Sequence, residues 1–202
     1  MPEIAIVGCG AAGVTFLRSF VAQIINHKIN VAITIFEKRD SKGGGIAYQP
    51  DLKNLLLNRP LQKMSATIDD NAEFEKWLLA HPEYTSEIIV EADGPDDKRA
   101  YTSREIFGHY LSSVLAETIE KAEKLGIKIT LIPYEAIQIH AEKPYAIEAG
   151  NGETYFADYL VLCSGNNKPR DIYHLKETPR YINDPYPLHQ TLTHIQKHET
   201  IS

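Results

Sequence analysis

The sequence predicts an α/β fold in which a central parallel sheet carries helices and a small antiparallel meander. Residues 4–36 read as strand, glycine turn, helix and strand, the succession with which a parallel sheet begins. Residues 136–157 contain three short alternating segments, and the apolar run after them ends in a Ser-Gly turn. The chain has 202 residues, which is enough for one domain with a substantial apolar core.

The N-terminal residues predict two strands, from continuous apolar runs, and one helix, from apolar residues at helical spacing. Ile4–Val7 is a short apolar run that leads directly into glycine, which predicts a buried strand. Residues 11–26 place apolar side chains at helical spacing and predict an amphipathic helix. Val31–Phe36 is a β-branched run that predicts the second strand, and it ends at Glu37.

The middle of the chain predicts helices separated by loops. Residues 41–45 (SKGGG) predict a flexible loop, and residues 71–80 (NAEFEKWLLA) predict a helix. Residues 91–105 (EADGPDDKRAYTSRE) are polar and rich in turn formers, which predicts an exposed loop. A long amphipathic helix is predicted over residues 103–125, with Gly126 as the residue that ends it.

The last third of the chain predicts strands. A strand over residues 127–132 precedes the meander, whose segments are separated by the turn sequences EKP and NGE. The apolar run at residues 159–163 predicts a buried strand that ends in a tight turn. The three meander segments are Ala136–Ala141, Tyr145–Ala149 and Thr154–Ala157.

Composition and short motifs argue against several classes of partner and site. The formal net charge is −6 and no long basic run is present, so nucleic acid and anionic membranes are not favoured as partners. The sequence shows neither a signal-peptide pattern nor an apolar run of membrane-spanning length. Cys9 and Cys163 form no CxxC motif and lie in apolar strand-like segments, so we expect buried thiols, no disulfide framework and a cytoplasmic protein. His194 and His198 have helical spacing but one nearby acid, so we expect no metal site.

Gly8, Gly10 and Gly13 form a G-x-G-x-x-G pattern between the first strand and the first helix. In a Rossmann-like turn the first glycine permits the tight bend, the second lets the backbone approach a pyrophosphate, and the third allows close packing of helix on sheet. The helix N-terminus then offers free N–H groups to the phosphates. The pattern predicts a dinucleotide site; the alternative is a glycine-rich turn without a ligand.

Glu37 ends the second strand, where a carboxylate can accept hydrogen bonds from ribose hydroxyls. The same charge would repel a 2′-phosphate, which favours FAD or NAD over NADP. Lys38 and Arg39 follow Glu37, and their positive charges weaken the argument against NADP. The glycines do not separate FAD from NAD, but the meander and the Cys-Ser-Gly turn are unlike a plain NAD-binding domain.

Seven stretches between residues 4 and 166 resemble the FAD/NAD(P)-binding domain of the two-dinucleotide-binding-domain flavoproteins. They are IAIVGCGAAG, ITIFEK, GGGIAY, NLLLNRPLQKMS, FEKWL, SREIFGHYL and ADYLVLCSGN. The most similar subgroup contains urate-hydroxylase-like and creatinine/nitroso-pathway-like FAD-NAD(P)-binding proteins. The resemblance implies a three-layer FAD/NAD(P)-binding domain over residues 1–167, with a helical insertion at about residues 50–110.

The resemblance also implies a set of cofactor-binding residues. The glycine turn would bind the FAD pyrophosphate, the end of the second strand the adenosine ribose, the backbone before the meander the adenine, and the Cys-Ser-Gly turn the flavin nucleotide. Two loop segments would contact the flavin ring. In that order, the residues are Gly8, Gly10, Ala11, Ala12 and Gly13; Glu37 and Lys38; Ala136 and Ile137; Cys163, Ser164 and Gly165; and Tyr48, Asn58, Met64 and Ser65.

Flavoproteins of this type carry a second dinucleotide-binding unit for NAD(P)H, yet no second G-x-G-x-x-G pattern occurs in the sequence. We expect residues 168–202 to be a tail or linker toward an absent second unit. A missing C-terminal domain or a homo-oligomer would then complete the protein.

Three functions stay open at this point. In the first, the chain is an FAD-dependent oxidoreductase or the FAD-binding part of one. NAD(P)H would reduce the flavin, and the substrate or electron acceptor would be a small molecule. Alternatively, it is a non-catalytic cofactor-binding module or truncated fragment, or a protein that binds NAD alone. The sequence shows no catalytic set of side chains, so it leaves open whether the chain is an enzyme.

Overall fold

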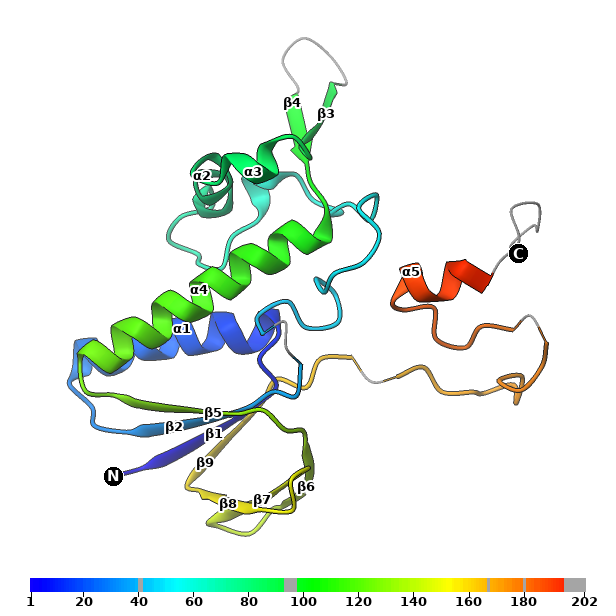
Figure 1. Cartoon of the computed structure of the whole chain (residues 1–202). Coiled ribbons are helices and arrows are strands. Elements are labelled where there is room, and N and C mark those ends of the chain that lie inside the picture. The colour runs from blue at the N-terminus through cyan, green and yellow to red at the C-terminus, as the bar shows by residue number, and fades with distance from the viewer. Residues whose placement is uncertain (40–41, 93–97, 167, 180, 195–202) are drawn as a thin grey trace.

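The computed structural model describes residues 1–39, 42–92, 98–166, 168–179 and 181–194. It contains a parallel sheet enclosed by two long helices on one face and an antiparallel sheet on the other (Figure 1). These three layers confirm the α/β fold that the sequence predicts. None of the described helices combines the length and the hydrophobicity that crossing a membrane requires.

The parallel sheet has the strand order β5-β2-β1-β9. β1 has a neighbour on each side, so that Ile6 lies beside Ile35 of β2 and beside Val161 of β9. Both faces of this strand are covered, which is why it reads as a continuous apolar run and not as an alternating one. The strands are β1 (Glu3–Val7), β2 (Ala32–Phe36), β5 (Lys128–Ile132) and β9 (Tyr159–Leu162).

Helices α1 (Ala11–His27) and α4 (Arg104–Lys124) cover one face of the parallel sheet (Figure 1). The Ser103 hydroxyl caps α4 by accepting a hydrogen bond from an N–H of its first turn, and Gly126 follows the helix with a φ of +76°. Both helices bury a stripe of apolar residues, as their spacing predicts. The stripe consists of Val14, Leu17, Val21 and Ile24 on α1 and of Phe107, Leu111, Val114 and Leu115 on α4.

The antiparallel sheet has the order β6-β7-β8 and lies against the opposite face of the parallel sheet (Figure 1). Its strands agree with the predicted meander: β6 is Ala136–His140, β7 is Tyr145–Ala149 and β8 is Thr154–Ala157. The two sheets share a small apolar core. Its buried members are Ala5, Phe36, Ile132, Ile147, Ala149 and Ala157.

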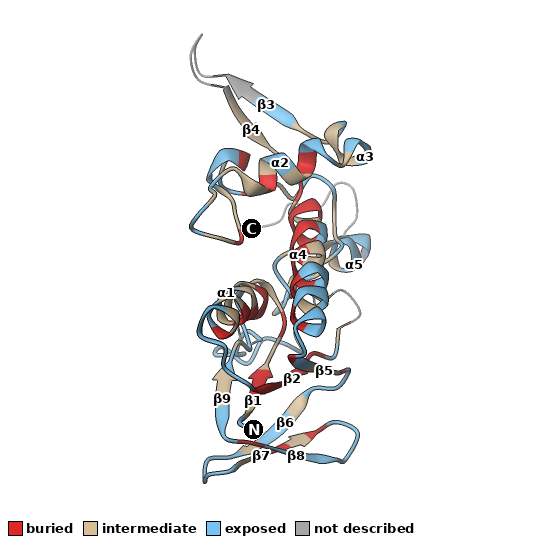
Figure 2. Cartoon of the chain, turned by 90° about the vertical axis from the view of Figure 1, so that its left-hand side faces the viewer, coloured by how far each residue is buried: buried red, intermediate tan, exposed pale blue. Residues whose placement is uncertain are grey.

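Between β2 and α4 the chain forms a separate layer above the long helices (Figure 2). It contains the 3₁₀ helix Leu61–Lys63, α2 (Glu73–Leu79) and α3 (Pro82–Thr85). β3 (Ile89–Ala92) and β4 (Lys98–Tyr101) pair as an antiparallel hairpin.

The hairpin corrects the prediction of an exposed loop over residues 91–105, of which residues 93–97 lie outside the described part of the chain. The two strands are held together by hydrogen bonds between their backbones. Such a pair can form without an alternating apolar pattern in the sequence. The polar composition of this segment therefore concealed the two strands.

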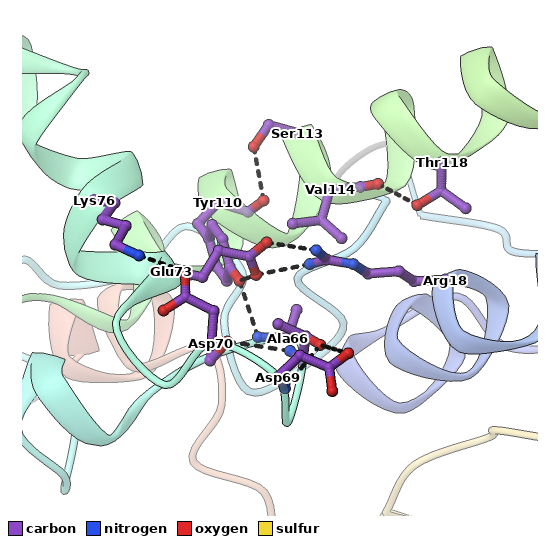
Figure 3. A network of polar contacts seen from close by, with 12 residues as sticks. Arg18, Ala66, Asp69, Asp70, Glu73, Lys76, Tyr110, Ser113, Val114 and Thr118 are labelled. Atoms are coloured by element: carbon purple, nitrogen blue, oxygen red, sulfur yellow. Dashed lines mark hydrogen bonds and ion pairs between the residues drawn. The ribbon is translucent and has the colours of Figure 1, made fainter. Parts of the chain in front are cut away.

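A polar network joins this layer to the long helices (Figure 3). The Arg18 guanidinium of α1 donates two hydrogen bonds to the Glu73 carboxylate of α2, at 2.7 and 2.5 Å. The Tyr110 hydroxyl of α4 donates to the same carboxylate and accepts a hydrogen bond from the Ala66 N–H at 2.9 Å. Three helices and one loop thus meet at a single carboxylate.

Electrostatics match these donor and acceptor roles. Burial, together with the hydrogen bond to Glu73, raises the pKa of Tyr110 to about 12, so its hydroxyl keeps its proton. Burial alone would raise the pKa of Glu73, but the hydrogen bonds from Arg18 and Tyr110 hold it below its ordinary value. The ionised carboxylate is therefore the form that the network stabilises.

We expect Tyr110→Phe to destabilise the protein. The change leaves the buried Ala66 N–H without an acceptor and removes one donor from Glu73, which should lower the free energy of unfolding by about 1–3 kcal/mol. Urea unfolding followed by circular dichroism measures the loss.

Tyr155→Phe is the matched control, because the Tyr155 hydroxyl also donates to a glutamate, Glu153, but at an exposed position. We expect this variant to change the free energy of unfolding by less than about 0.5 kcal/mol. Equal losses in the two variants would contradict the structural role of the buried network.

Candidate functional site

A cavity of about 710 Å³ opens beside the carboxyl ends of β1, β2 and β9. Ligands of open α/β sheets bind outside the carboxyl ends of the parallel strands. The turn after β1, the end of β2 and the turn after β9 all contribute to its wall. The volume lies within the range of small-molecule and cofactor sites.

The turn between β1 and α1 is packed backbone against backbone. Gly8 has a φ of +94°, and a Cβ added to it would lie 2.3 Å from the carbonyl oxygen of Cys163. A Cβ on Gly13 would lie 2.3 Å from the carbonyl oxygen of Gly8. Any side chain at these two positions would overlap with backbone atoms, so the first and third glycines of the pattern are required by the fold.

The second glycine faces the cavity. Gly10 is the N-cap residue of α1, and within the described chain no side chain caps this helix. Gly10, Ala11 and Ala12 line the cavity. The first N–H groups of a helix have no partner inside it and carry the positive end of the helix dipole, so this end of the cavity is suited to an anion.

The glycine-rich segment after β2 is seated on this turn. The Gly43 N–H donates to the Cys9 carbonyl oxygen at 2.8 Å, and a Cβ on Gly10 would lie 3.2 Å from the Cα of Gly45. Gly43, Gly44 and Gly45 are all buried. This corrects the prediction of a flexible loop for the part of residues 41–45 that the structure describes, because glycine here serves close packing.

The Glu37 carboxylate lies directly after β2, where it lines the cavity. Its side chain is buried, its Oε2 accepts a hydrogen bond from the Cys9 N–H at 2.9 Å, and its Oε1 accepts from the Arg39 N–H at 3.0 Å. The Arg39 guanidinium lies 3.2 Å from the same Oε1. Lys38 is exposed and pairs instead with Glu135 at 2.6 Å.

Cys9 lies beside this carboxylate but is not suited to nucleophilic chemistry. Burial, with the nearby Glu37 charge, raises the pKa of the Cys9 thiol to about 12. A thiol of that pKa stays protonated near neutral pH. Both cysteines are free thiols, and among the described residues no three His, Cys, Asp or Glu side chains gather as a metal site.

The cavity brings together much of the set of residues that the resemblance implies. These lining residues come from the glycine turn, the end of β2, the loop after it and the turn after β9. They are Gly8, Gly10, Ala11, Ala12, Glu37, Tyr48, Cys163, Ser164 and Gly165.

The remaining predicted residues lie outside the lining of the cavity. Met64 is partly buried against the main core, and the Ser65 hydroxyl accepts from the Thr67 N–H at 3.1 Å. Asn58 and Ile137 are exposed. Gly13 packs behind the turn, Lys38 pairs with Glu135, and Ala136 packs on the small core between the sheets. Their roles as cofactor contacts stay predictions.

Six charged side chains that the sequence did not assign to the site also line the cavity. Arg39 follows the Rossmann acid and Arg104 opens a helix, so each carried a positional signal. Asp51 and Asp184 carried none, because they lie in segments without clear periodicity, and Glu105 is an ordinary acid in the first turn of a helix. The six residues are Arg39, Asp51, Arg104, Glu105, Lys168 and Asp184.

Comparison with known proteins identifies one family. The family model described as FAD-NAD(P)-binding matches residues 5–167. No curated protein sequence matches the chain.

Solved structures share the fold at low identity. Tmm from a Pelagibacter strain is 18% identical with a TM-score of 0.49, covering 79% of this chain and 35% of that one. A flavin monooxygenase from Stenotrophomonas maltophilia is 17% identical with a TM-score of 0.46, covering 80% and 38%. FqzB is 18% identical with a TM-score of 0.42, covering 81% and 36%. The chain thus spans little more than a third of each, and similarities of this size carry no argument about activity.

Gly8→Ala should destabilise the protein more than a positive φ alone explains. Its Cβ would overlap with the Cys163 carbonyl, so we expect a loss of more than about 3 kcal/mol in the free energy of unfolding. Gly126→Ala is the control, since Gly126 has a φ of +76° with open space around it, and only the left-handed strain of about 1–2 kcal/mol applies. Similar losses for both, measured by urea unfolding, would show that the approach to Cys163 is not required.

Proposed function

Because the chain belongs to the FAD-NAD(P)-binding family, we propose that it binds FAD in the cavity and forms the FAD-binding part of an oxidoreductase. The observation that carries this proposal is the convergence of the glycine turn, Glu37 and the Cys163–Gly165 turn on one cavity of about 710 Å³. Nothing about the activity follows from the family alone, since its description names two dinucleotides.

The residues present fit a dinucleotide. The N–H groups at the start of α1 would bind the pyrophosphate, and Gly10 leaves room for the approach of its oxygens. Glu37 would accept a hydrogen bond from a ribose hydroxyl, in addition to those it accepts from Cys9 and Arg39. The turn of Cys163, Ser164 and Gly165 would line the nucleotide on the flavin side.

Two features favour FAD over NAD or NADP. In doubly wound NAD-binding folds helices cover both faces of the sheet, whereas here β6, β7 and β8 cover the second face. The buried Glu37 charge disfavours the 2′-phosphate of NADP at this site. NAD binding without flavin is the alternative that the first experiment tests.

In this proposal the bound FAD supplies two-electron redox chemistry, and NAD(P)H is its reductant. The protein's own residues bind and orient the cofactor, and the protonated Cys9 thiol takes no part. The small-molecule acceptor and the nicotinamide site belong to a further domain or a second copy of the chain. Two free cysteines support a cytoplasmic location.

A second candidate is a cofactor-binding module that does not turn over by itself. It is favoured by the sequence, which holds one G-x-G-x-x-G pattern, at Gly8, Gly10 and Gly13. Steady oxidation of NAD(P)H by the FAD-loaded chain would exclude this candidate.

The test of FAD binding is an absorption spectrum of the purified chain, recorded after FAD addition and desalting. Retained flavin bands support the proposal. A protein that binds NAD by calorimetry but retains no flavin would overturn it in favour of the NAD-only alternative.

Gly10→Val should weaken FAD binding by about 100-fold, equivalent to ~2.7 kcal/mol, because its side chain would press on the Gly45 backbone in the cavity wall and hinder the approach of the pyrophosphate. Gly150→Val is the control: a Cβ at Gly150 meets only ordinary contacts, on the antiparallel sheet away from the cavity. Fluorescence titration measures the FAD affinity of both variants, and thermal unfolding shows whether each variant folds. Parental affinity in Gly10→Val would contradict the assignment of the pyrophosphate to this turn.

A further inference from the structure

The tail after β9 lines the cavity instead of leading away from it. It leaves the edge of the parallel sheet and turns back toward the loop that follows β2, with α5 (Leu188–Thr191) and the 3₁₀ turn Leu192–His194 at its end (Figure 1). Asp184, Pro185, Tyr186 and Pro187 line the cavity on this side. The family match ends at residue 167, so the family does not account for this segment.

A carboxylate from the loop after β2 binds the far end of this segment. Asp51 Oδ2 accepts a hydrogen bond from the Leu188 N–H at 2.8 Å, and Asp51 Oδ1 accepts from the His189 N–H at 2.7 Å. The His189 Nδ1 lies 3.2 Å from Oδ1, and the Leu52 N–H donates to it at 2.9 Å. The Asp51 side chain is 8% exposed.

The buried Asp51 charge depends on these donors. Burial alone would raise the pKa of Asp51, but the N–H groups of His189, Leu188 and Leu52 hold it below its ordinary value. A carboxylate removed from water without such partners would be costly. The contact with Leu188 and His189 therefore supplies donors that a carboxylate with 8% exposure needs.

The near end of the segment is hydrogen-bonded to the first part of the tail. The Asn183 side-chain amide donates to the Pro169 carbonyl oxygen at 3.1 Å, close to the end of β9. The Thr191 hydroxyl donates to the Pro185 carbonyl oxygen at 2.8 Å, which braces the segment against α5. Residues 184–187 thus lie between two contacts with other lining residues of the cavity, Pro169 before them and Asp51 after them.

The side chains of this segment suit contact with a planar ligand. Pro185 and Pro187 have no N–H groups, so they leave no unpaired donor in the wall. Tyr186 lines the cavity and is 45% exposed, which leaves part of its ring free. An aromatic ring with a free face can pack against the face of a heterocycle such as adenine or flavin.

We propose that residues 184–187 form a wall of the dinucleotide site, that Tyr186 contacts the bound cofactor, and that Asp51 is the positioning residue that holds this wall in place. The proposal rests on the proposed function, because it concerns the same cavity. It changes the role of the tail from a linker to a part of the binding site. Its direct consequence is slower release of the cofactor.

The test compares FAD dissociation rates of four full-length variants, each loaded with FAD and diluted into an excess of an FAD-binding scavenger protein. Tyr186→Ala and Asp51→Ala should release FAD about 10-fold faster than the parent chain. Tyr173→Ala is the control for the first, because Tyr173 is 75% exposed in the same tail but does not line the cavity. Asp171→Ala is the control for the second, because Asp171 accepts two tail N–H groups away from the cavity.

Hydrogen exchange supplies a readout that does not depend on the variants. In the parent chain, FAD should slow amide exchange in the peptide that contains Tyr186, Leu188 and His189. Thermal unfolding of each cofactor-free variant shows whether it folds. If Asp51→Ala does not fold, Tyr186→Ala still tests the proposal.

The outcomes separate this inference from the proposed function. Parental release rates in Tyr186→Ala, with no change in exchange of the tail peptide, would overturn the inference and leave FAD binding intact. Equal acceleration by the control variants would overturn it as well. A parent chain that binds no dinucleotide would overturn both proposals.

Discussion

The meeting of three backbone segments at the end of β1 is the constraint on which the site depends. Gly8 lies against the Cys163 carbonyl, Gly13 lies against the Gly8 carbonyl, and Gly10 lies against Gly45, all at separations that leave little or no room for a side chain. This packing fixes where α1 begins and how β9 ends. It also determines that the first N–H groups of α1 point toward open space. The steric requirement of the fold and the chemical requirement of an anion site are therefore met by the same turn.

A second constraint connects this turn to the rest of the molecule. Arg18 of α1 and Tyr110 of α4 both bind Glu73 of α2, so the two long helices and the layer above them share one ionised carboxylate (Figure 3). Gly108 of α4 allows the backbone of Tyr48 to approach closely, because a Cβ there would lie 2.1 Å from the Tyr48 carbonyl oxygen. The loop that forms part of the cavity wall is thereby held against a rigid helix.

The cavity combines the start of α1, which carries the positive end of a helix dipole, with two carboxylates that already accept hydrogen bonds. Glu37 accepts from Cys9 and Arg39, and Asp51 accepts from Leu52 and from the tail. Both carboxylates thus meet the cavity with hydrogen-bond donors already bound, and the Glu37 charge still disfavours a 2′-phosphate beside it. The tail then adds an aromatic ring and two prolines to the cavity wall. Recognition of a cofactor here would come from two parts of the chain that fold against each other.

The sequence by itself determined the parallel sheet, the meander, the glycine turn and Glu37, because each depends on local periodicity or on spacing within one motif. Tertiary structure alone decided that residues 42–45 pack on the glycine turn, that β3 and β4 pair, and that Met64 packs against the core without lining the cavity. It also decided that Asp51 meets Leu188 and His189. No periodicity marks a contact between segments so far apart, since it arises only when the folded core brings both to the same cavity.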